Sequence, residues 1–413
     1  MQIPPALRQR SFALYWSGQF VSLAGSNMQL AALLWHLRDL SDQPLVVSGI
    51  GLARFLPVLL LAPFGGVVAD SYNRRKILFI TQSTLMLSAL MLGLLTYLQV
   101  IQIWHIYLLS ALNAVAMAFD GPARQALVPH LVPRDTLTNA FSLQSIASNS
   151  GAILGPALSG VVIAGLGQEY TYWINALTFL AVIAALAAIG PIAQEQRSAV
   201  VRGVKGSFLA IGEGVRFIVG KPIILSSMLL DFVATFFSSA NTLLPFVARD
   251  LLKVNEVAYG WLVAAESMGG VVVGLAFSQR ESVRRQGQVL FGAVCVYGAA
   301  TILFGLSRSF ALALLALTLV GAADAVSTIL RNTIRQISTP DHIRGRMVSI
   351  NQVFFMGGPQ LGNIEAGLVA QAFGIPFAII SGGIGCIVGA VLLAARWPEL
   401  RNYRHEPAAA AAD

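Results

Sequence analysis

Charged residues are scarce in this chain. Of its 413 residues, 11% are Asp, Glu, Lys or Arg, while 56% are hydrophobic. Soluble domains carry about 25% charged residues, because polar side chains must cover a water-exposed surface. The apolar residues form runs of roughly 20, the length at which a helix crosses a bilayer. The composition therefore excludes a soluble protein and predicts an all-α membrane protein with many spans.

Residue types that carry enzyme chemistry are also few. The two cysteines, Cys295 and Cys386, lie within apolar runs, so we expect buried thiols and no disulfide. Five scattered histidines offer no metal cluster. The chain lacks G-x-S-x-G, H-E-x-x-H and the phosphate-binding G-x-x-x-x-G-K-[ST], and its N-terminus does not resemble a cleaved signal peptide. We expect neither an enzyme nor an ATP-driven pump, and no cofactor or metal.

Hydropathy, with Pro, Gly and charge as boundaries, predicts twelve membrane spans. They are expected near 12–36, 46–69, 77–98, 104–128, 138–166, 171–190, 223–247, 258–279, 287–306, 309–333, 347–371 and 375–396.

Basic residues are distributed unevenly between the two sides that this assignment defines. Of 27 Lys and Arg, only Arg38, Arg249, Lys253 and Arg308 lie opposite the side of the termini, and Arg54 lies inside a span. The positive-inside rule therefore predicts that both termini are cytoplasmic, in the inner membrane of the cell. Membrane orientation also explains the +8 net charge, so nucleic acid is not an expected partner.

One polar stretch divides the spans into six and six. We expect an N-terminal six-helix bundle over 1–190, a linker over 191–222, a C-terminal bundle over 223–406 and a disordered tail over 407–413. In the linker, Phe208, Ile211, Val215 and Ile218 recur at helical spacing. This pattern predicts an amphipathic helix on the cytoplasmic surface of the bilayer.

The two halves contain an internal repeat. Residues 123–143 and 330–350 align without a gap at an offset of 207, so that Arg124 matches Arg331. The same offset places the glycines at 151, 155 and 160 on those at 358, 362 and 367. Parallel repeats of six spans with a cavity between them are a transporter architecture.

The turn between the second and third predicted spans carries a motif, Gly66-x-x-x-Asp70-x-x-x-Arg74-Arg75. With twelve spans in two halves, it resembles the major facilitator superfamily, and the resemblance covers essentially the whole chain. The family's loop motif usually has Gly where this chain has Asn73. A weaker copy of the charge pattern follows the eighth span at 278–285.

Two further segments indicate a branch of that superfamily. PARQALVPHLVPRDTLTNAFSL (122–143) resembles a signature of enterobactin-type siderophore exporters and macrolide efflux pumps. Gly151, Gly155, Pro156 and Gly160 resemble the antiporter motif of the fifth span, typical of exporters. One departure is Asn113, which stands where many proton-coupled members have an Arg in the fourth span.

The resemblance implies a gate at the loop motif. Gly66 would let helices approach closely, and Asp70 would meet the N-terminal end of span eleven near Met347. Arg74 would pair with Asp70 or with Asp120. The alternative is that these basic residues only fix the orientation of the chain in the membrane. We expect this simpler role for Lys76 and also for Arg75.

Five carboxyl groups lie inside predicted spans: Asp120, Asp231, Glu266, Asp324 and Glu365. A charge at membrane depth is costly unless it is paired, protonated or hydrated, so each is a candidate for proton or substrate contact. Mid-span Asp324 and Glu266 are the first choices. The alternative for each acid is a static ion pair or a solvated helix end.

Three other polar residues inside spans are candidates. Arg54 could meet an anionic substrate or hold a carboxylate in a structural pair, and Asn27 and Asn113 could line a cavity or join helices. Pro156 is expected to bend the fifth span.

The predicted function is secondary active transport by alternating access, with proton-coupled efflux of a small drug-like amphiphile or siderophore. The expected partners are the substrate, protons and the lipid bilayer, and the expected state is a monomer. The alternatives are uptake of a small nutrient and a membrane sensor that transports nothing. Which acid carries the proton stays open.

Overall fold

The computed structural model describes residues 4–190, 204–279 and 283–404. The described side chains do not include those of Ala62, Pro63, Asp70, 204–211, 341, 342, 344–346 and 349. The predicted tail at 407–413 and linker residues 191–203 lie outside the described residues.

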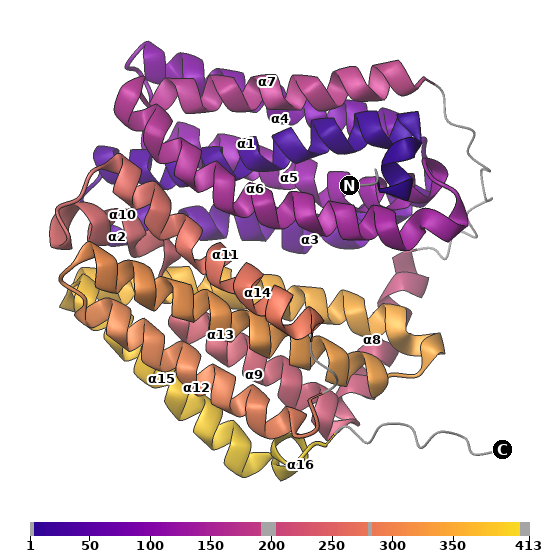
Figure 1. The fold of residues 1–413 in the computed structure, drawn as a ribbon, viewed down its shortest axis with the longest axis vertical. Helices are drawn as coiled ribbons and strands as arrows, with labels where there is room; N and C mark the ends of the chain where they lie inside the picture. The colour runs from indigo at the N-terminus through magenta and orange to yellow at the C-terminus, as the bar shows by residue number, and fades with distance from the viewer. Residues whose placement is uncertain (1–3, 191–203, 280–282, 405–413) are drawn as a thin grey trace. The chain divides into compact units, whose positions relative to one another are not determined.

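The chain forms two compact units. The first comprises residues 1–201 with 253–264, and the second comprises 202–252 with 265–413. Figure 1 shows that both are built from long helices.

The helices of the first unit are α1 (Arg10–Leu40), α2 (Pro44–Ser48), α3 (Ile50–Ser71), α4 (Arg74–Tyr97), α5 (Ile103–Leu127), α6 (Leu137–Gly165) and α7 (Gln168–Ile189). Helix α1 packs against α6 and α7, α3 packs against α5, and α4 packs against α5 and α7. The turn before α4 is stabilised by Asn73, whose side chain accepts a hydrogen bond of 3.1 Å from the Lys76 amide.

The second unit contains α8 (Val204–Val219), α9 (Pro222–Ser238), α10 (Leu244–Phe246), most of α11 (Glu256–Ser278), α12 (Gln286–Leu306), α13 (Phe310–Ile337), α14 (Asp341–Phe373), α15 (Ile375–Arg396) and α16 (Pro398–Arg401). Helix α9 packs against α14 and α15, and α12 packs against α13 and α15. Gly374, with φ of 91°, makes the turn between α14 and α15, a conformation that favours glycine.

Ten described segments are long and apolar enough to cross a membrane. Helices α1 and α14, with 31 and 33 residues, contain the predicted first and eleventh spans and are more polar. Helix α14 begins six residues before the predicted start of its span. The twelve long segments agree with the predicted all-α fold.

The seventh predicted span is not one continuous helix. Helix α9 ends at Ser238, a 3-10 turn follows at Asn241–Leu243, and α10 leads into a π-helical stretch at Val247–Leu251. The predicted seventh span, 223–247, therefore lies within an apolar segment long enough to cross a membrane, but it is built from several helical pieces. Ser239 at the break has an extended backbone, with φ −80° and ψ 100°.

Helix α8 occupies the segment for which an amphipathic helix is predicted. Ile218 is buried beside Ile224, Met228 and Met347, while Val215 is 44% exposed. The side chains of Phe208 and Ile211 lie outside those described. The end of α8 therefore packs onto the second unit.

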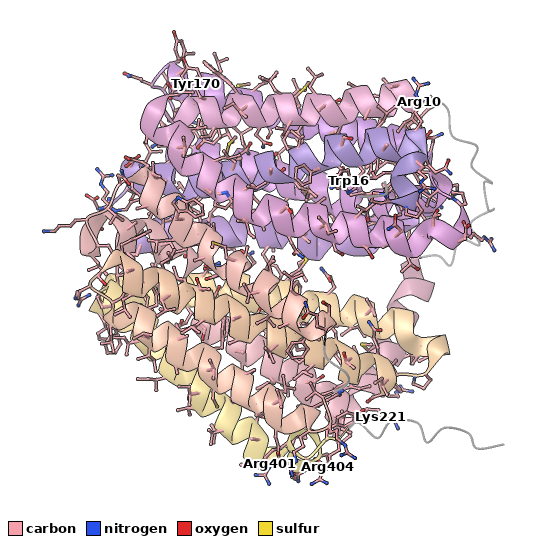
Figure 2. The ribbon with its side chains drawn as sticks, in the orientation of Figure 1. Arg10, Trp16, Tyr170, Lys221, Arg401 and Arg404 are labelled. Atoms are coloured by element: carbon pink, nitrogen blue, oxygen red, sulfur yellow. The ribbon has the colours of Figure 1, made fainter. Side chains whose placement is uncertain are left out.

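Basic side chains gather at particular ends of the units. In the second unit, Lys221, Arg401 and Arg404 lie at the same end (Figure 2). In the first, Arg10 and Tyr170 lie at opposite ends.

Candidate functional site

A row of polar side chains follows one face of α13. Asp324, Thr328, Arg331 and Arg335 recur at intervals of four, three and four residues, the spacing that places residues on the same face of a helix. Arg331 and Arg335 are only 1% and 3% exposed. Burying two guanidinium groups requires partners of opposite charge.

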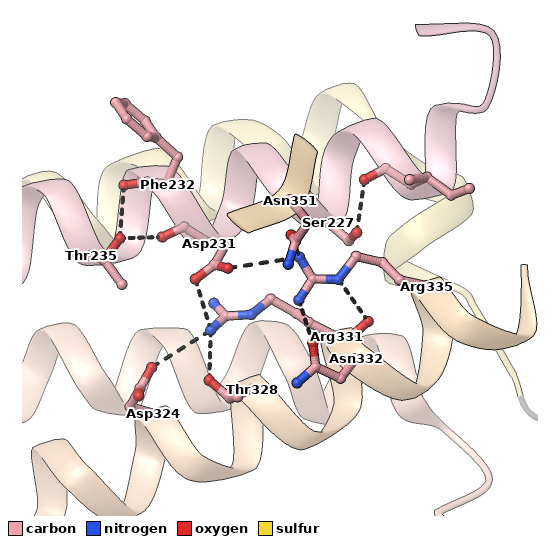
Figure 3. Close-up of polar contacts among 11 residues, drawn as sticks. Ser227, Asp231, Phe232, Thr235, Asp324, Thr328, Arg331, Asn332, Arg335 and Asn351 are labelled. Carbon is pink, nitrogen blue, oxygen red and sulfur yellow. Dashed lines mark hydrogen bonds and ion pairs between the residues drawn. The ribbon is translucent and has the colours of Figure 1, made fainter. Parts of the chain in front are cut away.

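Helix α9 supplies the buried partner, Asp231. Arg331 Nη2 lies 2.9 Å from Asp231 Oδ1 and 3.6 Å from Asp324 Oδ1, and it donates a 2.9 Å hydrogen bond to Thr328 Oγ1. Figure 3 shows Arg331 reaching both carboxyl groups. Asp231 is 1% exposed, whereas the side chain of Asp324 is 44% exposed. The two acids that share Arg331 thus differ strongly in burial.

Arg335 completes the cluster. Its Nη1 lies 3.8 Å from Asp231 Oδ2 and also donates to Asn351 of α14, while Nη2 donates to Asn332 at 2.9 Å. Two carboxylates and two guanidinium groups give this cluster no net charge when all four are ionised. We name Asp231, Asp324, Arg331 and Arg335 the α13 charge cluster.

The cluster is not saturated with hydrogen bonds. Within the described structure, Arg331 Nε and Nη1 are buried and have no hydrogen-bond partner. Each buried donor without a hydrogen-bond partner costs about 1–3 kcal/mol of stability. Arg331 therefore has two buried donor atoms that the described residues do not satisfy.

Glu266 lines a small cavity at the break between α9 and α10. The cavity is bordered by Ser238, Ala240, Asn241, Leu244, Glu266, Thr301, Phe304, Leu317 and Val320. Its volume is about 10 Å³, close to the space that one water molecule requires. Broken helices beside buried acids are a recurrent form of ion and substrate sites in transporters.

Close backbone contact brings α11 and α13 together at this level. A Cβ added at Gly321 would lie 1.8 Å from the carbonyl oxygen of Glu266, and one at Gly269 would lie 1.9 Å from that of Thr318. Only glycine allows such an approach. Because Asp324 follows Gly321 by three residues, it lies within one helical turn of the point where α13 meets the Glu266 backbone.

The first unit holds a smaller buried ion pair, between Asp120 and Arg124 of α5. Asp120 is fully buried and accepts hydrogen bonds from Thr81 at 2.9 Å and Gln82 at 2.7 Å. The sequence offered Asp120 as one of two partners for Arg74. In the structure Asp120 points toward α4 and its own helix, where its charged partner is Arg124.

Arg74 and Arg75 bind backbone carbonyls. Arg74 donates to Ala69 at 3.2 Å and Ala126 at 3.0 Å, and it contacts His130. Arg75 donates to Leu186 at 2.8 Å, at the end of α7, where a cation is favoured by the helix dipole. The predicted contacts of the Asp70 side chain lie outside the described residues.

The glycine that makes the close approach in this motif is Gly65. A Cβ at Gly65 would lie 2.2 Å from the Ala118 carbonyl oxygen of α5, whereas one at Gly66 would meet nothing within 4 Å. The prediction for Gly66 is wrong because adjacent helical residues point about 100° apart, and only Gly65 faces α5.

The other intramembrane candidates do not join the cluster. Arg54 is half-buried on α3, and Glu365 is half-buried on α14. Among the described residues neither has an ion pair or hydrogen bond through its side chain, so no structural carboxylate partner is found for Arg54. Asn27 donates to its own helix at Leu23, 2.8 Å away. The buried Asn113 Oδ1 has no hydrogen-bond partner in the described part of the chain.

The glycines of α6 are packing sites. A Cβ at Gly151 or Gly155 would lie 3.0 Å or 2.5 Å from the α1 backbone. Gly160 faces the start of α11 at Glu256, and Pro156 lies inside α6. Gly151 and Gly155 thus allow α6 to pack closely against α1.

Tyr297 of α12 is a further polar residue at the site, and the sequence did not single it out. One turn later, Thr301 lines the Glu266 cavity and donates to the Tyr297 carbonyl at 2.9 Å. A tyrosine within an apolar span has no pattern of its own, so only the packing reveals it.

Comparison with known families agrees with this architecture. The model of the transmembrane secretion effectors, a major facilitator family, matches residues 3–411. The chain belongs to this family. It is therefore a transporter of the major facilitator superfamily and a multi-pass membrane protein, and not an enzyme.

Characterised relatives of this transporter are exporters. It is 27% identical to the multidrug efflux pump Tap of Mycolicibacterium fortuitum, over 85% of this chain and 87% of that protein. It is 28% identical to the enterobactin exporter EntS of Escherichia coli, over 83% and 81%.

Solved structures share its fold. A bacterial homologue of the lysosomal transporter Spinster has a TM-score of 0.75 and 14% identity, and covers 98% of this chain and all of its own. The nucleoside transporter NupG has a TM-score of 0.72 and 14% identity, with 95% and 100% covered.

Proposed function

We propose that this transporter exports a small organic molecule, a drug-like amphiphile or a siderophore, in exchange for protons. The observation that carries the proposal is Glu266, which lines the cavity at the break after α9 and whose backbone meets α13 at Gly321, within one turn of Asp324 in the α13 charge cluster. Groups that bind and release protons inside the membrane are what such an exchange requires. The export direction is supported by the multidrug pump and the enterobactin exporter among the relatives.

Alternating access would expose the site to one side of the membrane at a time, as in other transporters built from repeats. The transporter would work as a monomer in the inner membrane with both termini in the cytoplasm, the orientation favoured by its basic residues. Its partners would be the substrate, protons and lipid, with no cofactor and no nucleic acid.

Everted membrane vesicles that contain the full-length protein test direction and coupling together. With a proton gradient that is acidic inside, we expect ethidium or enterobactin, one probe of each proposed class, to accumulate in the vesicles. Collapsing the gradient with nigericin should stop the accumulation. Vesicles from cells without the gene give the background.

Variants connect the activity to the site. Asp324→Asn and Glu266→Gln should each reduce gradient-driven accumulation at least tenfold, whereas Glu399→Gln, at an exposed acid of α16, should leave it unchanged. If neither site variant alters transport or its pH dependence, the coupling assignment is wrong. Accumulation only in right-side-out vesicles would instead establish the nutrient-uptake alternative.

A deletion strain widens the search for the substrate. Export predicts greater sensitivity to antibiotics or loss of a secreted siderophore, and both should be restored by the wild-type gene. A strain that differs in neither respect, with vesicles that move no solute, would support the sensor alternative.

A further inference from the structure

We propose that the cavity beside Glu266 binds one small monovalent cation, for which Na⁺ is the probe, and that this ion takes the place of a proton on the Glu266 carboxyl. The inference rests on the proposed function, in which Glu266 binds and releases protons, and it adds a second occupant of the same site. All residues that line the cavity belong to the second unit.

Oxygen-bearing side chains line the cavity from four elements. They belong to Ser238 at the end of α9, Asn241 in the 3-10 turn, Glu266 of α11 and Thr301 of α12. The other lining residues are apolar: Ala240, Leu244, Phe304, Leu317 and Val320. The volume of about 10 Å³ holds one body the size of a water molecule. A single ion without its hydration shell fits this space, whereas an organic substrate does not.

Ser238 contributes a hydroxyl that the surrounding protein does not satisfy. The residue is 6% exposed, and its buried Oγ has no hydrogen-bond partner among the described residues. The Cys386 thiol lies beside it but donates to the Val294 carbonyl, at 3.7 Å. A buried hydroxyl without a partner is costly. Its lone pairs are available to a cation in the cavity.

Thr301 offers lone pairs for a different reason. The residue is 3% exposed, and its Oγ1 donates its hydrogen to the Tyr297 carbonyl at 2.9 Å. Only the acceptor lone pairs of the oxygen then remain. This hydroxyl therefore favours a cation over an anion as its neighbour.

The charges at the cavity also favour a cation. Helix α9 ends at Ser238, and the C-terminal end of a helix carries a partial negative charge. Glu266 adds a carboxyl group that takes part in none of the ion pairs of the described residues. A carboxylate at membrane depth is costly without a countercharge. Broken helices in other transporters bind Na⁺ or protons through their C-terminal ends and unwound carbonyls.

The single carboxylate determines the charge of the ion. A monovalent cation neutralises Glu266, whereas a divalent cation would leave a net positive charge between apolar walls. Ca²⁺ ordinarily takes about 6–8 oxygen ligands, more than the lining side chains supply. A monovalent ion held by hydroxyl, amide and carboxylate oxygens does not need the cluster of histidines, cysteines and acids whose lack led the sequence to predict no metal.

Na⁺ and a proton exclude each other at Glu266. When Na⁺ binds, the O–H bond of the protonated carboxyl breaks, the proton leaves to the solvent and the carboxylate coordinates the ion. The total charge of the site is unchanged. Asn241 is exposed, so both ions can reach the carboxyl from its side of the cavity.

Other titratable and charged groups surround the site. On the neighbouring helices they include Tyr297 of α12, Asp324 of α13, Glu365 of α14, Cys386 of α15 and the Asp231–Arg331 pair. Asp324 lies within one turn of the crossing with α11, and its charge is balanced by Arg331 at 3.6 Å. The charge that changes between the two occupants is therefore that of Glu266.

Binding of radiolabelled Na⁺ to the purified full-length protein tests the site without a gradient or a substrate. We expect one ion per protein at alkaline pH, and less binding as the pH is lowered, because protons then hold Glu266. Unlabelled NaCl should displace the label, whereas MgCl₂ at equal ionic strength should not. A wild-type protein that binds no Na⁺, binds it equally at every pH or releases it equally to Mg²⁺ would overturn the proposal.

Variants locate the ion. Glu266→Gln should abolish binding, and Ser238→Ala and Thr301→Val should each weaken it at least tenfold, because each removes one oxygen. Thr84→Val is the matched control and should bind as wild type does, since Thr84 of α4 also donates to the carbonyl four residues earlier, at 2.9 Å. Thermal unfolding in choline chloride shows which variants are folded. If the folded site variants bind Na⁺ as tightly as wild type, the ion lies elsewhere and the proposal is wrong.

A stability measurement on the wild-type protein needs no variant. Because Na⁺ would bind the folded state, NaCl should raise the unfolding temperature above that in choline chloride at the same concentration. Equal unfolding temperatures in the two salts at alkaline pH would contradict the site.

These results separate the cation site from the proton exchange on which it rests. If vesicle transport ignores the pH gradient while Na⁺ binding that depends on Glu266 persists, the proposed function fails and the cation site stands. If the vesicles respond to the gradient and the purified protein binds no Na⁺, only the cation site fails.

Discussion

Arg331 of α13 and Asp231 of α9 form an ion pair of 2.9 Å in which each side chain is 1% exposed. The pair joins two helices whose residues lie about 100 positions apart in the sequence. The equivalent arginine of the first unit, Arg124, pairs with Asp120 within a single helix. The two repeats have thus kept an arginine and placed its carboxylate differently.

The buried pair predicts a large loss of stability when one partner is neutralised. Asp231→Asn should lower the free energy of unfolding by roughly 3–5 kcal/mol, because Arg331 would lose its nearest countercharge. Thermal unfolding in detergent measures the change. Asp42→Asn, at an acid that is 90% exposed and pairs with Arg38, is the control and should have little effect. Equal unfolding temperatures for the two variants would contradict the importance of burial.

The two glycines before the charged turn should respond differently to alanine. Gly65→Ala places a methyl group 2.2 Å from the Ala118 carbonyl oxygen and should cost about 1–3 kcal/mol as α3 and α5 are forced apart. Gly66→Ala meets nothing within 4 Å and should cost much less. Unfolding temperatures of the two proteins decide this, and a reversed order would show that the α3–α5 contact is wrong.

The crossing of α11 and α13 should be equally intolerant. In Gly321→Ala the new methyl group would overlap the Glu266 backbone, so we expect gradient-driven transport to fall at least tenfold. Gly274→Ala on α11 meets nothing within 4 Å and should transport normally. The vesicle assay compares them, with surface expression measured for each. Normal transport by the Gly321→Ala protein would exclude a role for this spacing.

Arg54 offers a test that separates structure from recognition. Arg54→Leu should leave the unfolding temperature unchanged or raised, since no structural partner is lost and an apolar side chain suits the membrane. Transport of enterobactin, an acidic siderophore, should fall more than transport of cationic ethidium. A marked loss of stability would instead indicate that Arg54 holds an ion pair in the folded protein.

Hydropathy and charge predicted much of this molecule. The long helices follow from apolar runs. The repeat that relates Arg124 to Arg331 is found by aligning the two halves of the sequence. Glu266 and Asp324 could be chosen because an acid inside an apolar run is conspicuous. These are local properties of the chain, which a single sequence contains.

Properties that depend on which faces meet could not be predicted. Hydropathy does not distinguish Gly65 from Gly66, although one contacts α5 and the other is open. The break after Ser238 is formed by Ser239 and Ala240, which are neither charged nor proline. Hydropathy therefore gives no sign that the seventh span is divided. Asp231 was a candidate as an intramembrane acid, but its pairing with Arg331 depends on the contact between α9 and α13.

The glycine contact between α11 and α13 also affects how the protein can diverge. Because Glu266 and Asp324 are spaced by main-chain contact at Gly321, their separation does not depend on the shapes of neighbouring side chains. Residues elsewhere in the cavity wall, such as Leu244, Phe304 and Leu317, are therefore open to substitution without moving the two acids. A lineage could therefore change the walls of this cavity while the contact between α11 and α13 is inherited intact.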